Sequence, residues 1–153
     1  MIDPGSDAFA RAALVSGRPR FVYTMRVRFQ DVDAAGIVFF ARIFDYCHDA
    51  YVEMLRHRNV RLEGVLRERS WGAPLTRAEA EFLRPLRFGD VVEVGVVRAR
   101  WDRGRLLIGY RLAREGGEVA AVARTEHAFI DAQFQKAAPP AELVAALADI
   151  VAE

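Results

Sequence analysis

Apolar and polar side chains follow two different periods in the first third of the chain. Between residues 21 and 30 every second residue is apolar, which predicts a strand with one buried face. From about residue 41 to residue 57 the apolar residues recur at spacings of three and four, which predicts a long amphipathic helix. This part of the chain is therefore expected to form one strand followed by one long helix.

The second half of the chain is expected to form four more strands and two shorter helices. The strands are predicted over residues 75–83, 90–100, 105–114 and 118–130, and the helices within 60–71 and over 141–151. Asp102-Arg103-Gly104 and Gly116-Gly117 separate the last three strands and are typical of hairpin turns. An amphipathic helix must bury its apolar face against a sheet. The pattern thus predicts an α+β domain in which a mostly antiparallel sheet wraps around one long central helix.

The last predicted strand has one face of small and polar residues. These alternate along the strand and are Ala121, Ala123, Thr125 and His127. Such a face suits either close packing of the helix or a ligand cleft, and His127 is expected to be hydrogen-bonded within the sheet. His48 is expected to serve packing or a subunit contact. His57 is expected at the end of the long helix, where a cation is favoured.

Residues 1–20 are expected to form a flexible leader, with a short helix over 8–15, before a single domain of residues 21–153. Charged residues throughout the leader exclude a secretory signal peptide. No apolar run is long enough to span a bilayer, and the net charge of +1 argues against bulk binding of nucleic acid. Cys47 is the only cysteine, which fits a reducing cytoplasm. The three histidines are too scattered for metal-ligand spacing, so we predict neither a metal nor a cofactor.

The junction between the first strand and the long helix carries the candidate chemistry. Asp31 and Asp33 come at the end of the strand, and Ala34-Ala35-Gly36 forms a hinge of small residues before the helix. The start of a helix presents free backbone N–H groups and the positive end of the helix dipole, which stabilise developing negative charge. A carboxylate beside such a site is suited to the hydrolysis of an acyl compound. The sequence has no G-x-S-x-G motif, which argues against a serine α/β-hydrolase.

This junction resembles a known family. Residues 31–38, Asp-x-Asp-Ala-Ala-Gly-Ile-Val, and the helix that follows resemble hotdog-fold acyl-CoA thioesterases of the 4-hydroxybenzoyl-CoA thioesterase type. The Pro…Gly-Asp turn of residues 84–90 is also common in that family, and the resemblance extends over residues 21–131. Within the helix, residues 40–51, FARIFDYCHDAY, are similar to a segment of 1,4-dihydroxy-2-naphthoyl-CoA thioesterases. The resemblance implies a hotdog fold and favours an aromatic acyl-CoA substrate.

The same resemblance assigns roles to residues of this chain. Asp33 matches the catalytic carboxylate of the family, which acts either as a nucleophile or as a general base on water. Capping of the helix is the simpler alternative for an aspartate at this position. The backbone N–H near Phe40 is the candidate to hold the thioester oxygen, and Gly36 permits a positive φ in the turn. Asp31 is expected to be an exposed loop acid, the alternatives being that it holds the loop or that it tunes the charge of Asp33.

Candidate substrate contacts come from aromatic and arginine side chains around this junction. They are Phe39, Tyr46, Arg84 and Arg87, with Arg42 and Arg124 as further candidates for phosphate contacts. Each of these arginines, taken singly, is also a plausible solvated surface residue.

These features predict a cytoplasmic acyl-CoA thioesterase that needs no cofactor. The edge strands of a hotdog sheet need pairing and family active sites lie between two subunits, so we expect a homo-oligomer, either a dimer or a tetramer of two dimers. Two alternatives stay open. One is a hotdog enzyme that acts on acyl carrier protein, and the other is a non-catalytic acyl-CoA-binding module.

Overall fold

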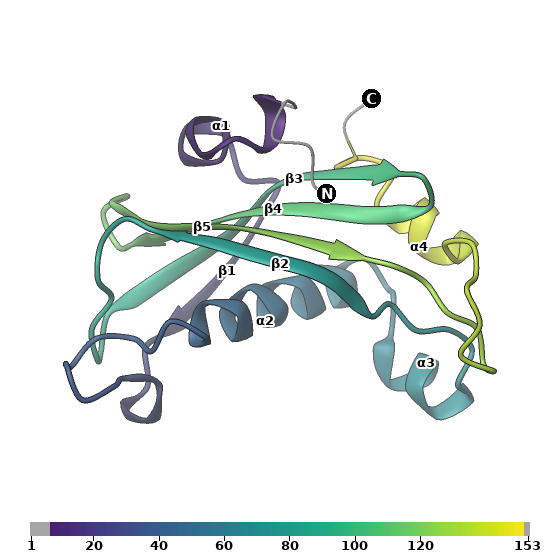
Figure 1. Ribbon diagram of the computed structural model, residues 1–153, viewed down its shortest axis with the longest axis horizontal. Coiled ribbons are helices and arrows are strands. Elements are labelled where there is room, and N and C mark those ends of the chain that lie inside the picture. The colour runs from purple at the N-terminus through teal and green to yellow at the C-terminus, as the bar shows by residue number, and fades with distance from the viewer. Residues whose placement is uncertain (1–6, 152–153) are drawn as a thin grey trace.

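The computed structural model describes residues 7–151 of the chain. Its helices are α1 (Arg11–Ser16), α2 (Arg42–His57), α3 (Leu62–Glu68) and α4 (Ala141–Ala146), with short 3₁₀ helices η1 (Asp7–Phe9) and η2 (Phe29–Asp31). Its strands are β1 (Phe21–Arg26), β2 (Leu75–Phe82), β3 (Val91–Asp102), β4 (Arg105–Arg114) and β5 (Val119–His127). Figure 1 shows the sheet as a central layer with α2 running along one face. The predicted order of a strand, a long helix, a short helix, four strands and a last helix is confirmed.

All five strands belong to one antiparallel sheet, in the order β1-β3-β4-β5-β2. β1 lies at one edge and pairs with β3, with Phe21 opposite Val96. β2 lies at the other edge and pairs with β5, with Ala80 opposite Ala123. α2 lies in the segment that connects these two edge strands, and the sheet curves around it (Figure 1). The predicted α+β architecture, a sheet wrapped around one central helix, is confirmed.

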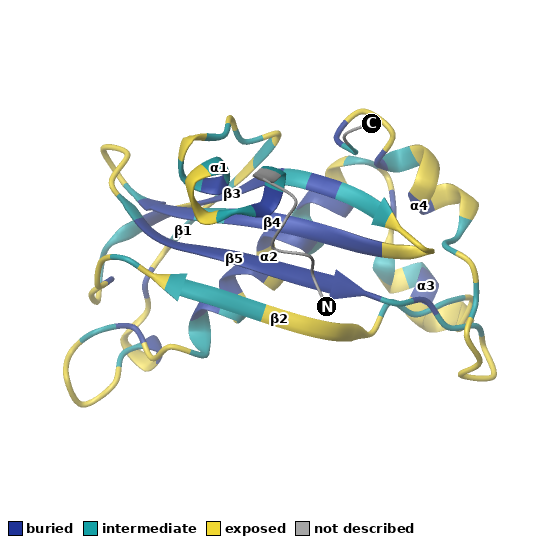
Figure 2. Ribbon diagram, turned by 45° about the horizontal axis from the view of Figure 1, so that its top comes forward, coloured by how far each residue is buried: buried dark blue, intermediate teal, exposed yellow. Residues whose placement is uncertain are grey.

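α2 packs on the sheet through one apolar stripe. Its residues Ile43, Cys47, Ala50 and Met54 are three or four positions apart, and each is at most 3% exposed. They share one core cluster with inward-facing side chains of β3, β4 and β5. Burying a large apolar side chain contributes about 1.5–3 kcal/mol relative to leaving it exposed, so this stripe fixes the helix on the sheet. Figure 2 shows the buried residues running along the three central strands.

The opposite face of the sheet is covered by residues 8–17. Phe9 and Leu14 are almost fully buried there, at 2% and 0% exposure. Gly109 on β4 makes room for them, because a Cβ at this position would lie 2.5 Å from a methyl carbon of Leu14. The Arg111 guanidinium donates to two backbone carbonyls of this segment, at 2.8 and 2.7 Å. Residues 8–17 of the predicted leader thus pack on the sheet, and residues 1–6 lie outside the described residues.

Some element boundaries differ from the predicted ones. β1 ends at Arg26 rather than residue 30, because the chain turns there into η2. β5 ends at His127, and Ile130 beyond it pairs with Gly72 in an isolated bridge. α4 stops at Ala146, and the chain then continues to a bridge between residue 151 and β3. Both predicted ends of β4 are confirmed. Among residues 7–151, no helix is long and apolar enough to cross a membrane.

Candidate active site

Residues 32–38, which we call the Asp33 loop, form a small hairpin between η2 and α2. Val32 and Val38 pair across its base, and the Asp33 N–H donates to the Ile37 carbonyl at 2.8 Å. Gly36 has a φ of +80°, a conformation that glycine adopts without steric cost. The Asp33 side chain is exposed, and its Oδ1 accepts one hydrogen bond, from the Ala35 N–H at 2.8 Å. The hairpin thus holds the Asp33 carboxylate exposed, and among the described residues this carboxylate accepts no other hydrogen bond.

Asp31, at the base of the same loop, is fully buried, so the expectation of an exposed loop acid is wrong. Its Oδ2 accepts from the Tyr46 hydroxyl at 2.8 Å, and both of its carboxylate oxygens accept from the Arg28 guanidinium at 3.1 Å. The Arg28 backbone N–H donates to Oδ2 as well, at 3.2 Å. We call these three side chains the Asp31 anchor. It joins the end of β1 to the second turn of α2, and Asp31 therefore holds the loop, as the alternative interpretation had it.

The anchor changes the protonation of its members. Burial raises the pKa of the Asp31 carboxyl, but the hydrogen bonds from Arg28 and Tyr46 lower it by more, so this pKa lies below its ordinary value. Burial, together with the bond to Asp31, raises the pKa of the Tyr46 hydroxyl well above its ordinary value. Asp31 is therefore ionised and Tyr46 protonated at neutral pH. This charge state keeps the hydrogen bonds of the anchor intact.

The N-terminus of α2 lies directly after the Asp33 loop and has no side-chain cap. The N–H groups of Arg42, Ile43 and Phe44 donate to carbonyls three residues earlier. Those of Phe40 and Ala41, by contrast, donate to no acceptor among the described residues. Free N–H groups at the start of a helix of 16 residues are positioned to bind an anionic oxygen. The start of α2 therefore offers two candidate donors beside the Asp33 loop.

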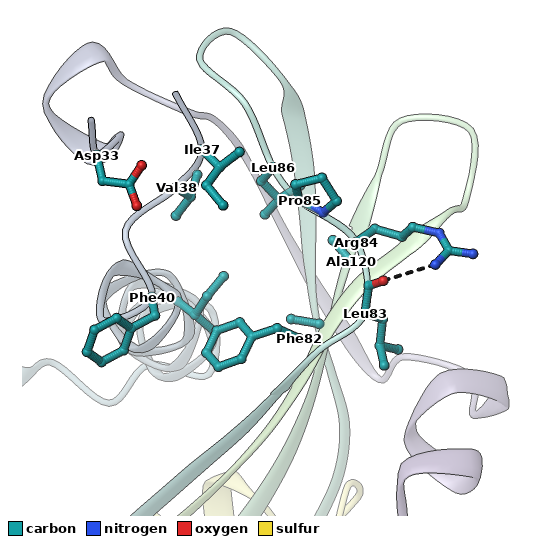
Figure 3. A pocket seen from close by; sticks show the side chains of 12 residues that line it. Asp33, Ile37, Val38, Phe40, Phe82, Leu83, Arg84, Pro85, Leu86 and Ala120 are labelled. Carbon is teal, nitrogen blue, oxygen red and sulfur yellow. Dashed lines mark hydrogen bonds between the residues drawn. The ribbon is translucent and has the colours of Figure 1, made fainter. Parts of the chain in front are cut away.

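A cavity of about 360 Å³ opens in front of Asp33. Figure 3 shows Asp33 on one side of it, with the rings of Phe40 and Phe82 together below and Arg84 across from them. Most of the remaining wall is apolar and comes from the Asp33 loop, the first turn of α2, the segment after β2 and the start of β5. These lining residues are Ile37, Val38, Ile43, Leu83, Pro85, Leu86, Ala120 and Ala121. A mainly apolar cavity of this volume with a carboxylate at its wall is typical of a small-molecule site.

The other predicted substrate contacts are distributed unevenly around this cavity. Phe39 is 44% exposed and packs on the Phe40 ring at 4.7 Å, without lining the cavity. Tyr46 is completely buried in the Asp31 anchor, so in this structure it is not accessible to a substrate. Arg84 lines the cavity, and its guanidinium donates to the Leu83 carbonyl at 3.1 Å (Figure 3). Arg87 is exposed outside it and pairs with Ile37 in an isolated bridge.

The two further arginine candidates are engaged elsewhere. Arg124 is buried on the face of the sheet opposite α2, where it donates to the Phe9 carbonyl and to Glu81. Arg42 pairs with Asp45 at 3.0 Å and lies 3.8 Å from Asp31. Of all the arginines that the sequence suggested for phosphate contacts, Arg84 is therefore the one in the cavity wall.

Several cavity residues were not among the sequence candidates, namely Phe82, Pro85 and Ala120. They come from β2, β5 and the segment between β2 and β3, far along the chain from Asp33. The small residues of β5 were the available signal, and they do allow a hollow between this strand and α2. His127 is hydrogen-bonded, as predicted, through Nδ1, which donates to the Ala73 carbonyl oxygen at 3.1 Å. No group of three potential metal ligands occurs among residues 7–151.

Comparisons with known proteins point to one family. The sequence model of the thioesterase-like superfamily matches residues 27–147. A 1,4-dihydroxy-2-naphthoyl-CoA hydrolase from Thermosynechococcus vestitus is 35% identical over 117 residues, which cover 76% of this chain and 80% of that protein. Its counterpart from Nostoc punctiforme is 35% identical over 81% of this chain and 84% of its own length. The crystal structure of a 1,4-dihydroxy-2-naphthoyl-CoA thioesterase from Synechocystis superposes with a TM-score of 0.78 at 27% identity, covering 85% of this chain and 96% of that one.

Proposed function

Since the chain belongs to the thioesterase-like superfamily and is an acyl-CoA thioester hydrolase, we propose that it hydrolyses an aromatic acyl-CoA of the 1,4-dihydroxy-2-naphthoyl type, with Asp33 as its catalytic carboxylate. The observation that carries the proposal is an exposed Asp33 in the wall of one mainly apolar cavity that Phe40 also lines, next to the start of α2, where the Phe40 and Ala41 N–H groups have no acceptor among the described residues. The names of the two relatives supply the acyl group.

The geometry supports a simple division of work. The thioester carbonyl oxygen binds the N–H groups of Phe40 and Ala41, which stabilise the negative charge that develops on it. Asp33 then acts in one of two ways. As a nucleophile it attacks the carbonyl carbon and forms a mixed anhydride, CoA leaves as the thiolate, and water hydrolyses the anhydride. As a general base it takes a proton from a water that attacks the same carbon, and that proton ends on the departing sulfur.

Phe40 and Phe82 support an aromatic substrate because the rings of both lie in the cavity wall (Figure 3). Offset or edge-on contacts between aromatic rings contribute about 0.5–1.5 kcal/mol beyond the area that they bury. If such contacts are stronger in the transition state, they raise kcat/KM by up to about tenfold. Arg84 is the candidate for a CoA phosphate, because it is the cavity arginine that makes no ion pair among the described residues.

The edge strand β2 supports the proposal of a homodimer. Its backbone pairs with β5 on one side, and its first four residues are exposed. An unpaired edge of this length invites pairing with the same strand of a second copy, related by a twofold axis. Phe82, at the end of β2, lies in the cavity wall, so such a dimer would place the partner next to the site. Light scattering should give at least a dimer, and an active monomer would contradict this arrangement.

A thiol-release assay with a panel of acyl-CoA substrates tests the proposed function. We expect higher kcat/KM for 1,4-dihydroxy-2-naphthoyl-, hydroxybenzoyl- and benzoyl-CoA than for palmitoyl-CoA. Faster turnover of palmitoyl-CoA than of all the aromatic thioesters would contradict the substrate class. Release of thiol from acyl carrier protein alone would favour the alternative enzyme. Binding of acyl-CoA without any release would favour a non-catalytic module.

A further inference from the structure

The cavity in front of Asp33 has an exposed rim and a buried floor. Asp33, Arg84 and Pro85 are exposed, and Phe40 and Phe82 are 61% and 54% exposed. Five other lining residues are at most 9% exposed, namely Val38, Ile43, Leu86, Ala120 and Ala121. The exposed residues surround the mouth of the cavity, and the buried ones form its floor.

Rim and floor suit different parts of an acyl-CoA. The CoA part carries phosphates and is too large for a cavity of about 360 Å³, so it stays at the rim, where Arg84 is exposed. An aromatic acyl group is apolar and gains free energy when it leaves water. With the thioester held between Asp33 and the free N–H groups at the start of α2, the acyl group points to the floor. The floor therefore limits how large this group can be.

The floor contains two consecutive residues of β5, Ala120 and Ala121, which we call the alanine pair. Successive side chains of a regular strand point to opposite faces, yet both alanines line this cavity and belong to one core cluster. The cause is a β-bulge. Leu112 of β4 pairs with Ala121 and Ala113 pairs with Val119, so Ala120 has no opposite residue on β4. Bulges redirect side chains and are frequent next to active sites. This bulge brings a second alanine to the floor.

Backbone hydrogen bonds tie the bulge to the rim. The N–H groups of Leu83 and Arg84 both donate to the Ala120 carbonyl, at 2.8 and 3.0 Å. On β2, Phe82 of the rim lies opposite Ala121. Figure 3 shows Ala120 next to Arg84, on the side of the cavity opposite Asp33. Because main-chain atoms make these bonds, a larger side chain at either alanine changes the volume of the floor and leaves its frame in place.

The two alanines are the small side chains of this floor. The side chain of alanine ends at Cβ, whereas the other three floor residues carry branched aliphatic side chains. Every carbon atom added at position 120 or 121 takes space directly from the cavity. One methylene group more or less in a hydrophobic pocket changes kcat/KM by about 10–200-fold. Small changes at the alanine pair are therefore sufficient to separate a single ring from two fused rings.

We propose that the alanine pair at the bulge of β5 sets the size of the acyl group that the cavity accepts. Its two small side chains leave the depth that a second fused ring needs. The proposal rests on the proposed function and adds to it the residues that determine specificity for acyl size. A larger side chain at either position turns a site for two fused rings into a site for one ring.

The test measures thiol release from 1,4-dihydroxy-2-naphthoyl-CoA and from benzoyl-CoA and takes the ratio of the two kcat/KM values. Ala121→Val should lower this ratio by about tenfold or more, because the naphthoyl group loses its space while the benzoyl group still fits. Ala120→Val should lower it in the same direction. Both substrates are measured on one preparation, so the fraction of folded protein cancels from the ratio. Ala123→Val is the matched control, since Ala123 is a fully buried residue of β5 in the same core cluster that does not line the cavity. It should keep the ratio of the unmodified protein.

Two results would overturn the role of the alanine pair and leave the proposed function standing. One is an unchanged ratio in both Ala120→Val and Ala121→Val, which would mean that these alanines serve only the packing of α2 on the sheet. The other is an equal decrease in Ala123→Val, which would mean that crowding anywhere along β5 has the same effect. If the unmodified protein hydrolyses neither thioester but another acyl-CoA, the proposed substrate class fails and the size limit with it.

Discussion

Asp31 and Asp33 are the same type of residue, two positions apart, and the fold uses them in opposite ways. Asp31 is 0% exposed and accepts hydrogen bonds from the backbone and guanidinium of Arg28 and from the Tyr46 hydroxyl. Asp33 is exposed at a cavity wall and accepts one hydrogen bond, from the Ala35 N–H. The acceptor capacity of the first carboxylate is used for structure, and that of the second is left for a ligand.

This difference shows how a loop can hold a carboxylate in place through its neighbours, without hydrogen bonds that use up the carboxylate itself. The backbone carbonyl of Asp31 accepts from the Phe39 N–H at 2.8 Å, so the Asp31 anchor fixes the loop on both sides of Asp33. The loop is closed in addition by the pairing of Val32 with Val38. Preorganisation therefore comes from neighbours of Asp33, and its own carboxylate keeps its free lone pairs.

The largest expected effect comes from removing the charge of the exposed carboxylate. Asp33→Asn keeps the shape of the side chain and removes both the nucleophile and the base. We predict a loss of at least about a hundredfold in kcat with little change in KM. Thiol release gives the rate, and circular dichroism should show an unchanged fold. Near-normal turnover in the purified variant would remove Asp33 from the mechanism.

The same substitution at the buried position should act on stability instead. Asp31→Asn replaces charge-assisted hydrogen bonds by weaker ones and leaves the Arg28 charge without its partner. We predict a decrease of about 2–3 kcal/mol in the free energy of unfolding, measured by urea titration. Asp45→Asn is the matched control, since this exposed residue also pairs with an arginine, Arg42, at 3.0 Å. Its cost should stay below about 1 kcal/mol, and an equal cost at both positions would contradict the role of burial.

A smaller loss is expected when one donor of the anchor is removed. Tyr46→Phe keeps the ring in the core and deletes the hydroxyl that donates to Asp31 at 2.8 Å. Asp31 retains the donors of Arg28, so we predict a loss of about 1–1.5 kcal/mol in the free energy of unfolding. In the Asp31→Asn background the same change should cost clearly less, because the two residues are coupled. If the losses of the two single variants simply added up in the double variant, Asp31 and Tyr46 would not stabilise the fold through their mutual hydrogen bond.

The smallest expected effect is a change of the free energy of unfolding at acidic pH. The pKa of Asp31 is lower in the folded chain than in the unfolded one, where carboxyl groups have a pKa of about 4. Its contribution to stability is therefore complete above that pH and is lost as the pH falls through the folded pKa. Urea titrations at decreasing pH should show the stability difference between the unmodified protein and Asp31→Asn becoming smaller below about pH 4. If the stability difference between the two proteins grew as the pH fell, the pKa of Asp31 could not be lowered by folding.

The sequence was sufficient to predict the elements and the position of Asp33 before α2, and the reasons are local. Both ends of β4 follow from hairpin turns, at residues 102–104 and 116–117, where Gly104, Gly116 and Gly117 all have positive φ. α2 follows from its apolar stripe, and the place of Asp33 before the helix follows from a continuous motif. Each of these features is encoded within a few neighbouring residues.

The remaining features depend on contacts between distant segments. Asp31 looks like an exposed acid because charged residues in loops usually are, and its burial depends on a partner, Tyr46, within α2. Tyr46 looks like a ligand contact because the sequence does not show that its hydroxyl has a partner, Asp31, inside the protein. Phe82 enters the cavity wall only through the pairing of β2 with β5, and Leu14 is buried only because Gly109 leaves space on β4. No local pattern in the sequence contains these pairings.

The central claim is that the exposed carboxylate performs the chemistry while the buried one holds the loop. The most direct test measures kcat for Asp31→Asn and Asp33→Asn side by side, per folded molecule, at a temperature where both variants remain folded. The account predicts that Asp33→Asn loses at least about a hundredfold while Asp31→Asn stays within about tenfold of the unmodified protein. The opposite ranking, with turnover lost at position 31 and retained at position 33, would contradict it.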